Sequence, residues 1–146
     1  MRRGLLAVGI LALVAALAAA AWALRSDGSL TISGDILVKD LNIRMIGEPC
    51  SGARPFLHVH PGAEVVIRDA EGETVAEGTL EGSEAVLAYA ELEELERAPS
   101  GCMLSFEVAG VPELDSYTIE VAGRHEVTKT RSELEDDGWF VEMEVP

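Results

Sequence analysis

The feature that most constrains this chain is a two-residue alternation of apolar and polar side chains, which recurs throughout the part after residue 29. In the segment from Cys102 to Val108, the even-numbered positions are apolar, and Ser105 and Glu107 lie between them. Residues 117–121 repeat the pattern. Because successive side chains of a strand point to opposite faces, this alternation indicates strands with one buried and one solvated face.

The clearest pair of strands surrounds an Ala-Glu-Gly turn at residues 70–72. A β-branched run at residues 64–69 precedes this turn and residues 73–77 follow it, so we expect a β-hairpin. About seven such short strands with turn signals between them predict an all-β fold, a two-sheet antiparallel sandwich. Its core is expected to contain Phe106, Tyr117 and Trp139.

Two segments are less regular. Residues 86–97 are expected to form a strand that continues into a short acidic helix, and Pro99 prevents any further helix. Residues 132–135, Ser-Glu-Leu-Glu, have the spacing of a capping box. We therefore expect a single helical turn before Gly138.

The N-terminus has the pattern of a membrane anchor or a signal segment. Arg2 and Arg3 precede an uncharged run at residues 5–24, which is long enough to span about 30 Å of hydrocarbon. A cleaved signal usually has a shorter apolar core, so we expect an uncleaved anchor. The alternative is secretion after cleavage near Ala23, because Ala-Trp-Ala at residues 21–23 fits a cleavage site.

The basic start of the chain favours a cytoplasmic N-terminus, with the C-terminal domain outside the cell membrane. The chain then divides into a signal-anchor or signal peptide at residues 1–25, a linker at residues 26–29 and a β-sandwich domain at residues 30–146. The expected location is the cell membrane, which the protein crosses once.

The charge of the chain limits its partners. The net charge is −15, from 11 basic and 26 acidic side chains. Such acidity argues against binding to nucleic acid or to anionic lipid headgroups, since both are bound through basic faces. It favours a protein partner with a basic face.

The chain has two cysteines, Cys50 and Cys102. Outside the cytoplasm the simplest expectation is one disulfide between them. Neither thiol belongs to a Cys-x-x-Cys motif or has a neighbouring lysine or histidine, which disfavours a metal or redox role.

The one cluster with a chemical signature lies at residues 56–61, which include His58 and His60. On a strand, side chains two residues apart share a face, so two neutral imidazoles can share a Zn or Cu ion. His125 or a carboxylate would complete the site. The alternative is that both histidines are exposed or hydrogen-bonded at the entry to the next strand.

No motif in the sequence predicts catalysis. The nucleophile motif Gly-x-Ser-x-Gly, a phosphate loop and a dinucleotide fingerprint are missing from it. The glutamates of residues 91–96 are better explained as a charged loop than as an acid–base pair, because no pocket is indicated that would raise a pKa. We therefore expect a protein that is not an enzyme and has no cofactor.

Four segments together resemble a known type of protein. They are Cys50-Ser51-Gly52, residues 61–69, the stretch from Cys102 to Phe106 followed by Val111-Pro112, and residues 117–121. In this order they are similar to small exported or membrane-anchored β-sandwich proteins of GC-rich Gram-positive bacteria, with a transthyretin-like or immunoglobulin-like module. The resemblance covers residues 48–146. It implies the fold and the cysteine pair, and it assigns no catalytic or binding residue.

Two functional hypotheses follow. The first is a non-enzymatic accessory or binding module outside the cytoplasm, anchored in the envelope by its N-terminal helix. Its partner would be an envelope or membrane protein with a basic face. The second is an envelope protein that binds Cu or Zn through the pair formed by His58 and His60.

Overall fold

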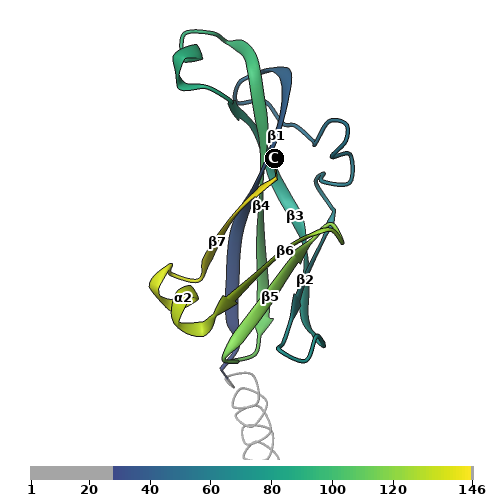
Figure 1. Ribbon diagram of the computed structural model, residues 1–146, viewed down its shortest axis with the longest axis vertical. Coiled ribbons are helices and arrows are strands. Elements are labelled where there is room, and N and C mark those ends of the chain that lie inside the picture. The colour runs from purple at the N-terminus through teal and green to yellow at the C-terminus, as the bar shows by residue number, and fades with distance from the viewer. Residues whose placement is uncertain (1–27, 146) are drawn as a thin grey trace, which may run out of the picture.

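The computed structural model describes residues 28–145, and the expected anchor at residues 1–25 lies outside them. The chain forms seven strands, one short 3₁₀ helix (η1) and one short α-helix (α2) (Figure 1). They are β1 (Leu30–Met45), β2 (Glu64–Arg68), β3 (Thr74–Leu87), η1 (Ala90–Leu92), β4 (Arg97–Val111), β5 (Ser116–Val121), β6 (His125–Thr130), α2 (Arg131–Asp136) and β7 (Phe140–Val145). The all-β prediction is therefore confirmed.

The strands form one hydrogen-bonded sheet in the order β6-β5-β2-β3-β4-β1-β7, not two separate sheets. The long strand β3 joins the two halves, because its first part pairs with β2 and its second part with β4. The register shifts between Leu80 and Ser83, where the strand changes partner. Such an irregularity lets a strand bend and twist.

The prediction of a purely antiparallel arrangement is wrong for one pair of strands. β7 runs parallel to β1, from Ser33 opposite Phe140 to Val38 opposite Val145. The chain reaches this position through α2, which connects β6 at one edge of the sheet to β7 at the other. Figure 1 shows β5 and β6 crossing in front of β1 and β4, so the sheet curls around a common core.

The predicted hairpin is present. Arg68 lies opposite Thr74 at the β2–β3 turn. The acidic segment after β3 forms only the single turn η1. The expected helical turn before Gly138 is α2, but its cap lies two residues earlier than predicted. Thr130, and not Ser132, is the N-cap, and its side chain and that of Glu133 form a reciprocal capping box.

The core lies inside the curled sheet and follows the alternation read from the sequence. Phe106 and Tyr117 are buried as expected. Trp139 is only partly buried, and its ring packs edge-on against Tyr117 with ring centroids 6.0 Å apart. The Tyr117 hydroxyl accepts a hydrogen bond from the Leu114 N–H (2.8 Å) and donates one to the Pro112 carbonyl (3.2 Å). These two hydrogen bonds give the buried hydroxyl both a donor and an acceptor, and they attach the β4–β5 connection to the core.

The predicted disulfide between Cys50 and Cys102 is present, with the two Cα atoms 5.8 Å apart. It attaches the irregular segment between β1 and β2 to the middle of β4. Within residues 28–145, no helix is both long and apolar enough to cross a membrane.

Candidate functional site

Of the two arrangements expected for His58 and His60, the structure has the exposed or hydrogen-bonded one and not a shared strand face. Residues 56–61 form turns rather than a strand, so His58 and His60 do not share a strand face. The His60 ring is exposed, and its Nδ1 lies 2.8 Å from the carbonyl of Pro61. His58 instead meets His125, at the start of β6, with their Nε2 atoms 2.8 Å apart.

His58 and His125 form a hydrogen bond between two segments that are distant in sequence. The rings are stacked, with centroids 5.0 Å apart and planes 18° apart. At 2.8 Å one Nε2 must carry the hydrogen and the other must be an unprotonated acceptor. The contact therefore ties the segment between β1 and β2 to the β5–β6 turn only while one of the two rings is neutral.

The surroundings favour the neutral form of both rings. Burial lowers the pKa of His58, and the positive charges of Arg124, His125 and His60 lower it further. Burial and Arg124 also lower the pKa of His125. Neutral imidazoles are the form that binds metal ions. Within residues 28–145, however, no group of three or more His, Cys, Asp or Glu side chains is arranged to hold a metal ion.

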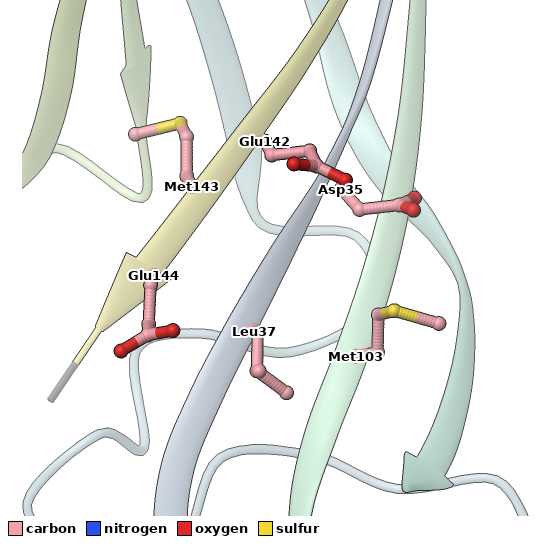
Figure 2. Close-up of a pocket in the computed structure, with 6 residues that line it drawn as sticks. All are labelled: Asp35, Leu37, Met103, Glu142, Met143 and Glu144. Atoms are coloured by element: carbon pink, nitrogen blue, oxygen red, sulfur yellow. The ribbon is translucent and has the colours of Figure 1, made fainter.

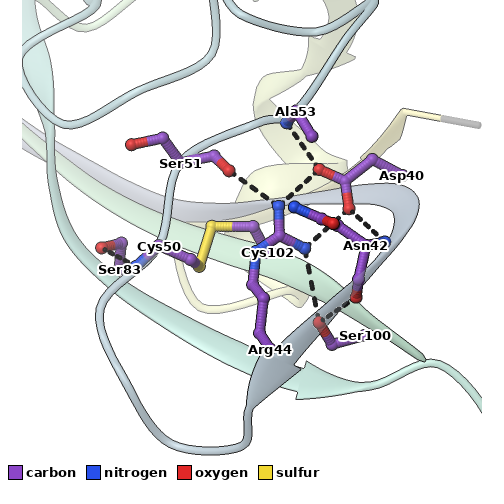
Figure 3. Close-up of a disulfide and its surroundings, with 9 residues drawn as sticks. All are labelled: Asp40, Asn42, Arg44, Cys50, Ser51, Ala53, Ser83, Ser100 and Cys102. Atoms are coloured by element: carbon purple, nitrogen blue, oxygen red, sulfur yellow. Dashed lines mark hydrogen bonds and ion pairs between the residues drawn. A yellow bond between two sulfur atoms is a disulfide. The ribbon is translucent and has the colours of Figure 1, made fainter. Parts of the chain in front are cut away.

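A second polar cluster surrounds the disulfide and contains a buried ion pair (Figure 3). The side chain of Asp40 is fully buried, and that of Arg44 is 12% exposed. The two terminal guanidinium nitrogens of Arg44, Nη1 and Nη2, donate to the two oxygens of the Asp40 carboxylate, each at 2.7 Å. This bidentate geometry is the strongest form of an arginine–carboxylate contact.

The ion pair also holds the neighbouring segments. Arg44 donates to the carbonyl of Ser51 (2.9 Å) and to the hydroxyl of Ser100 (3.3 Å). Asp40 accepts the backbone N–H of Ala53 at 2.6 Å. Burial raises the pKa of Asp40, but the hydrogen bonds from Arg44 and the backbone and the charge of Arg44 outweigh it, so the pKa is lowered overall. The cluster clamps the segment after β1 onto one face of β1 and β4.

The opposite, outward face of the same strands carries a hollow of about 390 Å³ (Figure 2). Leu37 and Met103 are cross-strand partners there. Asp35, Glu142 and Glu144 surround this apolar floor. The hollow thus combines apolar contact area with a carboxylate rim.

Two of these carboxylates are direct neighbours, because Asp35 lies opposite Glu142 in the parallel β1–β7 pair (Figure 2). Burial raises the pKa of Asp35, and the negative charge of Glu142 raises it further. Glu144, one step along, forms an ion pair with Lys39 at 2.8 Å. A cation placed between Asp35 and Glu142 would relieve their repulsion.

A further hollow of about 540 Å³ lies across β2, β3 and β4. Four carboxylates line it: Glu64, Glu77, Glu81 and Glu107. None of the four takes part in an ion pair within the described part of the chain. Both hollows are thus lined by carboxylates.

Comparison with known proteins gives no match: no family model, no curated protein and no solved structure is similar to this chain. The site therefore has to be interpreted from its own geometry.

Sequence reasoning missed two contacts. The pair formed by Asp40 and Arg44 has a spacing of four residues, which on a regular strand would separate the side chains by about 13 Å. They meet because the register of β1 shifts between Val38 and Asn42. The sequence signal for this pair was an arginine four positions after an aspartate. The direct hydrogen bond between His58 and His125 was also missed, because the sequence analysis named the two residues only as candidate ligands of one metal ion. Their contact depends on how a turn segment packs on the sheet.

Proposed function

We propose that the protein is a non-enzymatic binding module of the cell envelope. Residues 1–25 anchor it in the membrane, residues 30–146 stand outside, and the acidic outward face of the sheet binds an envelope or membrane protein with a basic face. The observation that carries this proposal is the hollow on β1, β4 and β7, where an apolar floor meets Asp35 and Glu142, two neighbouring carboxylates that form no ion pair within the described residues. A basic, partly apolar surface complements both features.

The finer fold assignment belongs to the same proposal. We infer an immunoglobulin-like or transthyretin-like sandwich whose two layers are joined through β3. Supporting it is the contact of the Tyr117 hydroxyl with the backbone at Leu114 and Pro112. A tyrosine placed in this way, bonding to the backbone a few residues upstream, is typical of Greek-key sandwiches.

A binding role also fits the chemistry of the described residues better than catalysis does. Asp35 and Glu142 are two carboxylates on neighbouring strands, opposite one another in the sheet. They lie on a sheet face, with Leu37 and Met103 beside them and no serine, cysteine or histidine nucleophile lining the hollow. Such an arrangement holds a ligand without activating it.

The test is affinity purification of the full chain from solubilised membranes, at low and at high salt. We expect one stoichiometric partner that is retained at low salt and released at high salt, because exposed charge pairs are screened. The double variant Asp35→Asn/Glu142→Gln should lose most of that partner. The matched control, Glu71→Gln/Glu73→Gln on the β2–β3 turn, should keep it. Recovery of no stoichiometric partner at either salt would refute the binding module.

A second candidate function is binding of Zn or Cu, and the 2.8 Å contact between His58 and His125 favours it. These two residues would be the ligands, His60 would not take part, and water or a mobile carboxylate would complete the coordination. A Zn(II) and Cu(II) titration of the oxidised full chain tests it. One-to-one binding that is lost in His125→Asn and kept in His60→Asn would support the site. Weak binding that is equal in all three proteins would remove it.

A further inference from the structure

An apolar stripe continues from the hollow along the outward face of β4. The side chains of one β4 face are Arg97, Pro99, Gly101, Met103 and Ser105, because strand residues alternate between faces. Gly101 leaves room for a neighbour on that face. A Cβ atom built there would lie 2.9 Å from Leu37 Cδ1, so the leucine side chain lies across the glycine.

Beyond Gly101 the stripe passes onto the end of β1. Ile43 is the cross-strand partner of Pro99, and Met45 that of Arg97, so these side chains share the outward face. Leu41 lies where the register of β1 is irregular. Its φ of 53° is in the left-handed region, which costs an L-residue other than glycine conformational energy.

This part of the sheet concentrates the exposed apolar side chains. Of the seven large hydrophobic residues that are exposed within residues 28–145, five lie here, with exposures of 46–58%. They are Leu41, Ile43 and Met45 on β1, and Tyr89 and Leu95 at the tip of the β3–β4 hairpin. Exposed apolar side chains gathered at one end of a domain are typical of an interaction site.

The end of β1 and the beginning of β4 form a two-stranded ribbon, and its two faces differ in how far they are covered. On one face the clamp of Asp40 and Arg44 and the disulfide fasten the segment after β1 to the strands. On the other face, Ile43 and Met45 are exposed. The ribbon is therefore held in one conformation by buried polar contacts while its apolar face stays open, a preorganised surface that loses little entropy when it binds.

The rim of the stripe is acidic. The hairpin tip carries Glu91, Glu93, Glu94 and Glu96, which are all exposed. None of these four forms an ion pair within the described ranges of the chain. At the other end of the stripe lie the carboxylates of the hollow. The one basic side chain on the stripe is Arg97.

The ribbon lies at the end of the domain farthest from where β1 begins (Figure 1). β1 has 16 residues, which at about 3.3 Å each spans roughly 50 Å. The ribbon therefore lies about the length of β1 away from Leu30, near the beginning of the described part of the chain.

We propose that the stripe from Met103 to Met45 is the docking surface of the module. Its occupant is a protein segment that presents a row of aliphatic or aromatic side chains flanked by lysine or arginine. Charge complementarity selects this occupant, because the apolar floor is bordered by the hairpin-tip glutamates at one end and by Asp35 and Glu142 at the other, none of which forms an ion pair within residues 28–145. A second copy of the chain would place two acidic tips together, and an anionic lipid surface would repel the same glutamates. The inference rests on the proposed binding function and names its surface.

The test uses a displayed library of short random peptides, selected against the full chain in zwitterionic detergent. We expect the enriched peptides to combine lysine or arginine with large apolar residues. Ile43→Ser and Met45→Ser, made separately, should each weaken binding of the best peptide by at least about tenfold, as truncation of an apolar anchor residue does. Both side chains are exposed, so neither change removes a core residue.

Matched control variants distinguish binding at this surface from non-specific hydrophobic binding. Leu57→Ser changes a leucine that is as exposed as Ile43, at 58%, but lies in the segment between β1 and β2; it should leave peptide binding unchanged. Glu93→Gln/Glu94→Gln should weaken binding and flatten its salt dependence, whereas Glu71→Gln/Glu73→Gln should not.

Three results would overturn the proposal. One is enrichment of peptides without basic residues, or of none at all. Another is peptide binding that Ile43→Ser and Met45→Ser leave intact. The third is self-association, or co-sedimentation with anionic vesicles, that these same variants abolish. If the membrane partner of the wild-type chain is purified equally well with Ile43→Ser, the binding function stands and only this surface is wrong.

Discussion

Replacing Arg44 by methionine tests the clamp that holds the ribbon. Methionine keeps the apolar stem of the side chain and removes four hydrogen bonds, two to Asp40 and one each to Ser51 and Ser100. The Asp40 carboxylate is fully buried, so it would be left without a countercharge. Breaking a buried pair by removing one partner typically costs about 3–5 kcal/mol. Asp40 keeps its bonds from the backbone of Ala53 and Asn42, so we expect the lower end, about 3 kcal/mol.

The assay is equilibrium urea unfolding of the oxidised protein, followed by near-ultraviolet circular dichroism. The double variant Asp40→Asn/Arg44→Met removes the stranded charge along with its partner. It should therefore be more stable than Arg44→Met alone, with a coupling of more than about 1 kcal/mol in the double-mutant cycle. A loss below about 1 kcal/mol for Arg44→Met, or a coupling near zero, would refute the clamp as the element that fixes this segment.

The pH dependence gives a second readout of the same clamp. The pKa of Asp40 is lowered below its ordinary value of 3.8. Its contribution to stability is complete above that ordinary value and is lost as the pH falls through the lowered native pKa. In Arg44→Met, burial persists without the guanidinium, so the native pKa of Asp40 rises and this acid-induced loss of stability should shrink or become a gain. Unfolding curves measured between neutral and acidic pH, for both proteins, would show this difference.

Three further predictions follow from other parts of the structure. Cys50→Ser/Cys102→Ser opens a link across a sequence separation of 52, and the chain-entropy estimate gives a loss of about 4 kcal/mol; urea unfolding should show it, and an unchanged midpoint would contradict it. Because the pKa of both His58 and His125 is lowered from 6.5, the unfolded chain binds protons more strongly, so stability should fall as the pH drops through 6.5 and on through the lower native pKa values. In His125→Asn part of that fall should disappear, which thermal melts across this pH range would detect. Finally, Leu41→Gly should be more stable than Leu41→Ala by about 1 kcal/mol, the reverse of the usual strand order, because φ is 53° there; the usual order in denaturant melts would contradict the left-handed backbone.

The strands could be predicted because their physics is local. Alternation of side chains between faces placed Phe106 and Tyr117 inside, and the turn at residues 70–72 marked the β2–β3 hairpin. The cysteine pair followed from the expected oxidising compartment. The strands and the turn depend on residues that are neighbours in sequence, and two cysteines can pair in only one way.

The arrangement of the strands could not be predicted in the same way. That β3 serves both halves of the sheet depends on its length and on the irregularity between Leu80 and Ser83. The parallel pairing of β7 with β1 depends on the position of α2, which determines where the chain enters β7. Both are consequences of packing between segments distant in sequence, which periodicity does not report.

The same limit applied to the candidate sites. The histidine prediction assumed a strand at residues 56–61, and the turns found there replace His60 by His125 as the neighbour of His58. Likewise, the exposed stripe at Ile43 and Met45 looks in the sequence like one more alternating strand. The structure is needed to show that the other face of these strands is covered by the segment after β1, which leaves Ile43 and Met45 exposed.

The central claim is that the outward face of β1 and β4 binds a partner. Site-specific photo-cross-linking tests it most directly, with a photoreactive residue placed at Leu37 or Met103 on that face, or at Glu126 on β6 as a control. We predict one shared cross-linked partner from Leu37 and Met103, formed at low salt and lost at high salt, and none from Glu126. Equal cross-linking from all three positions, or none from the outward face at either salt, would contradict the account.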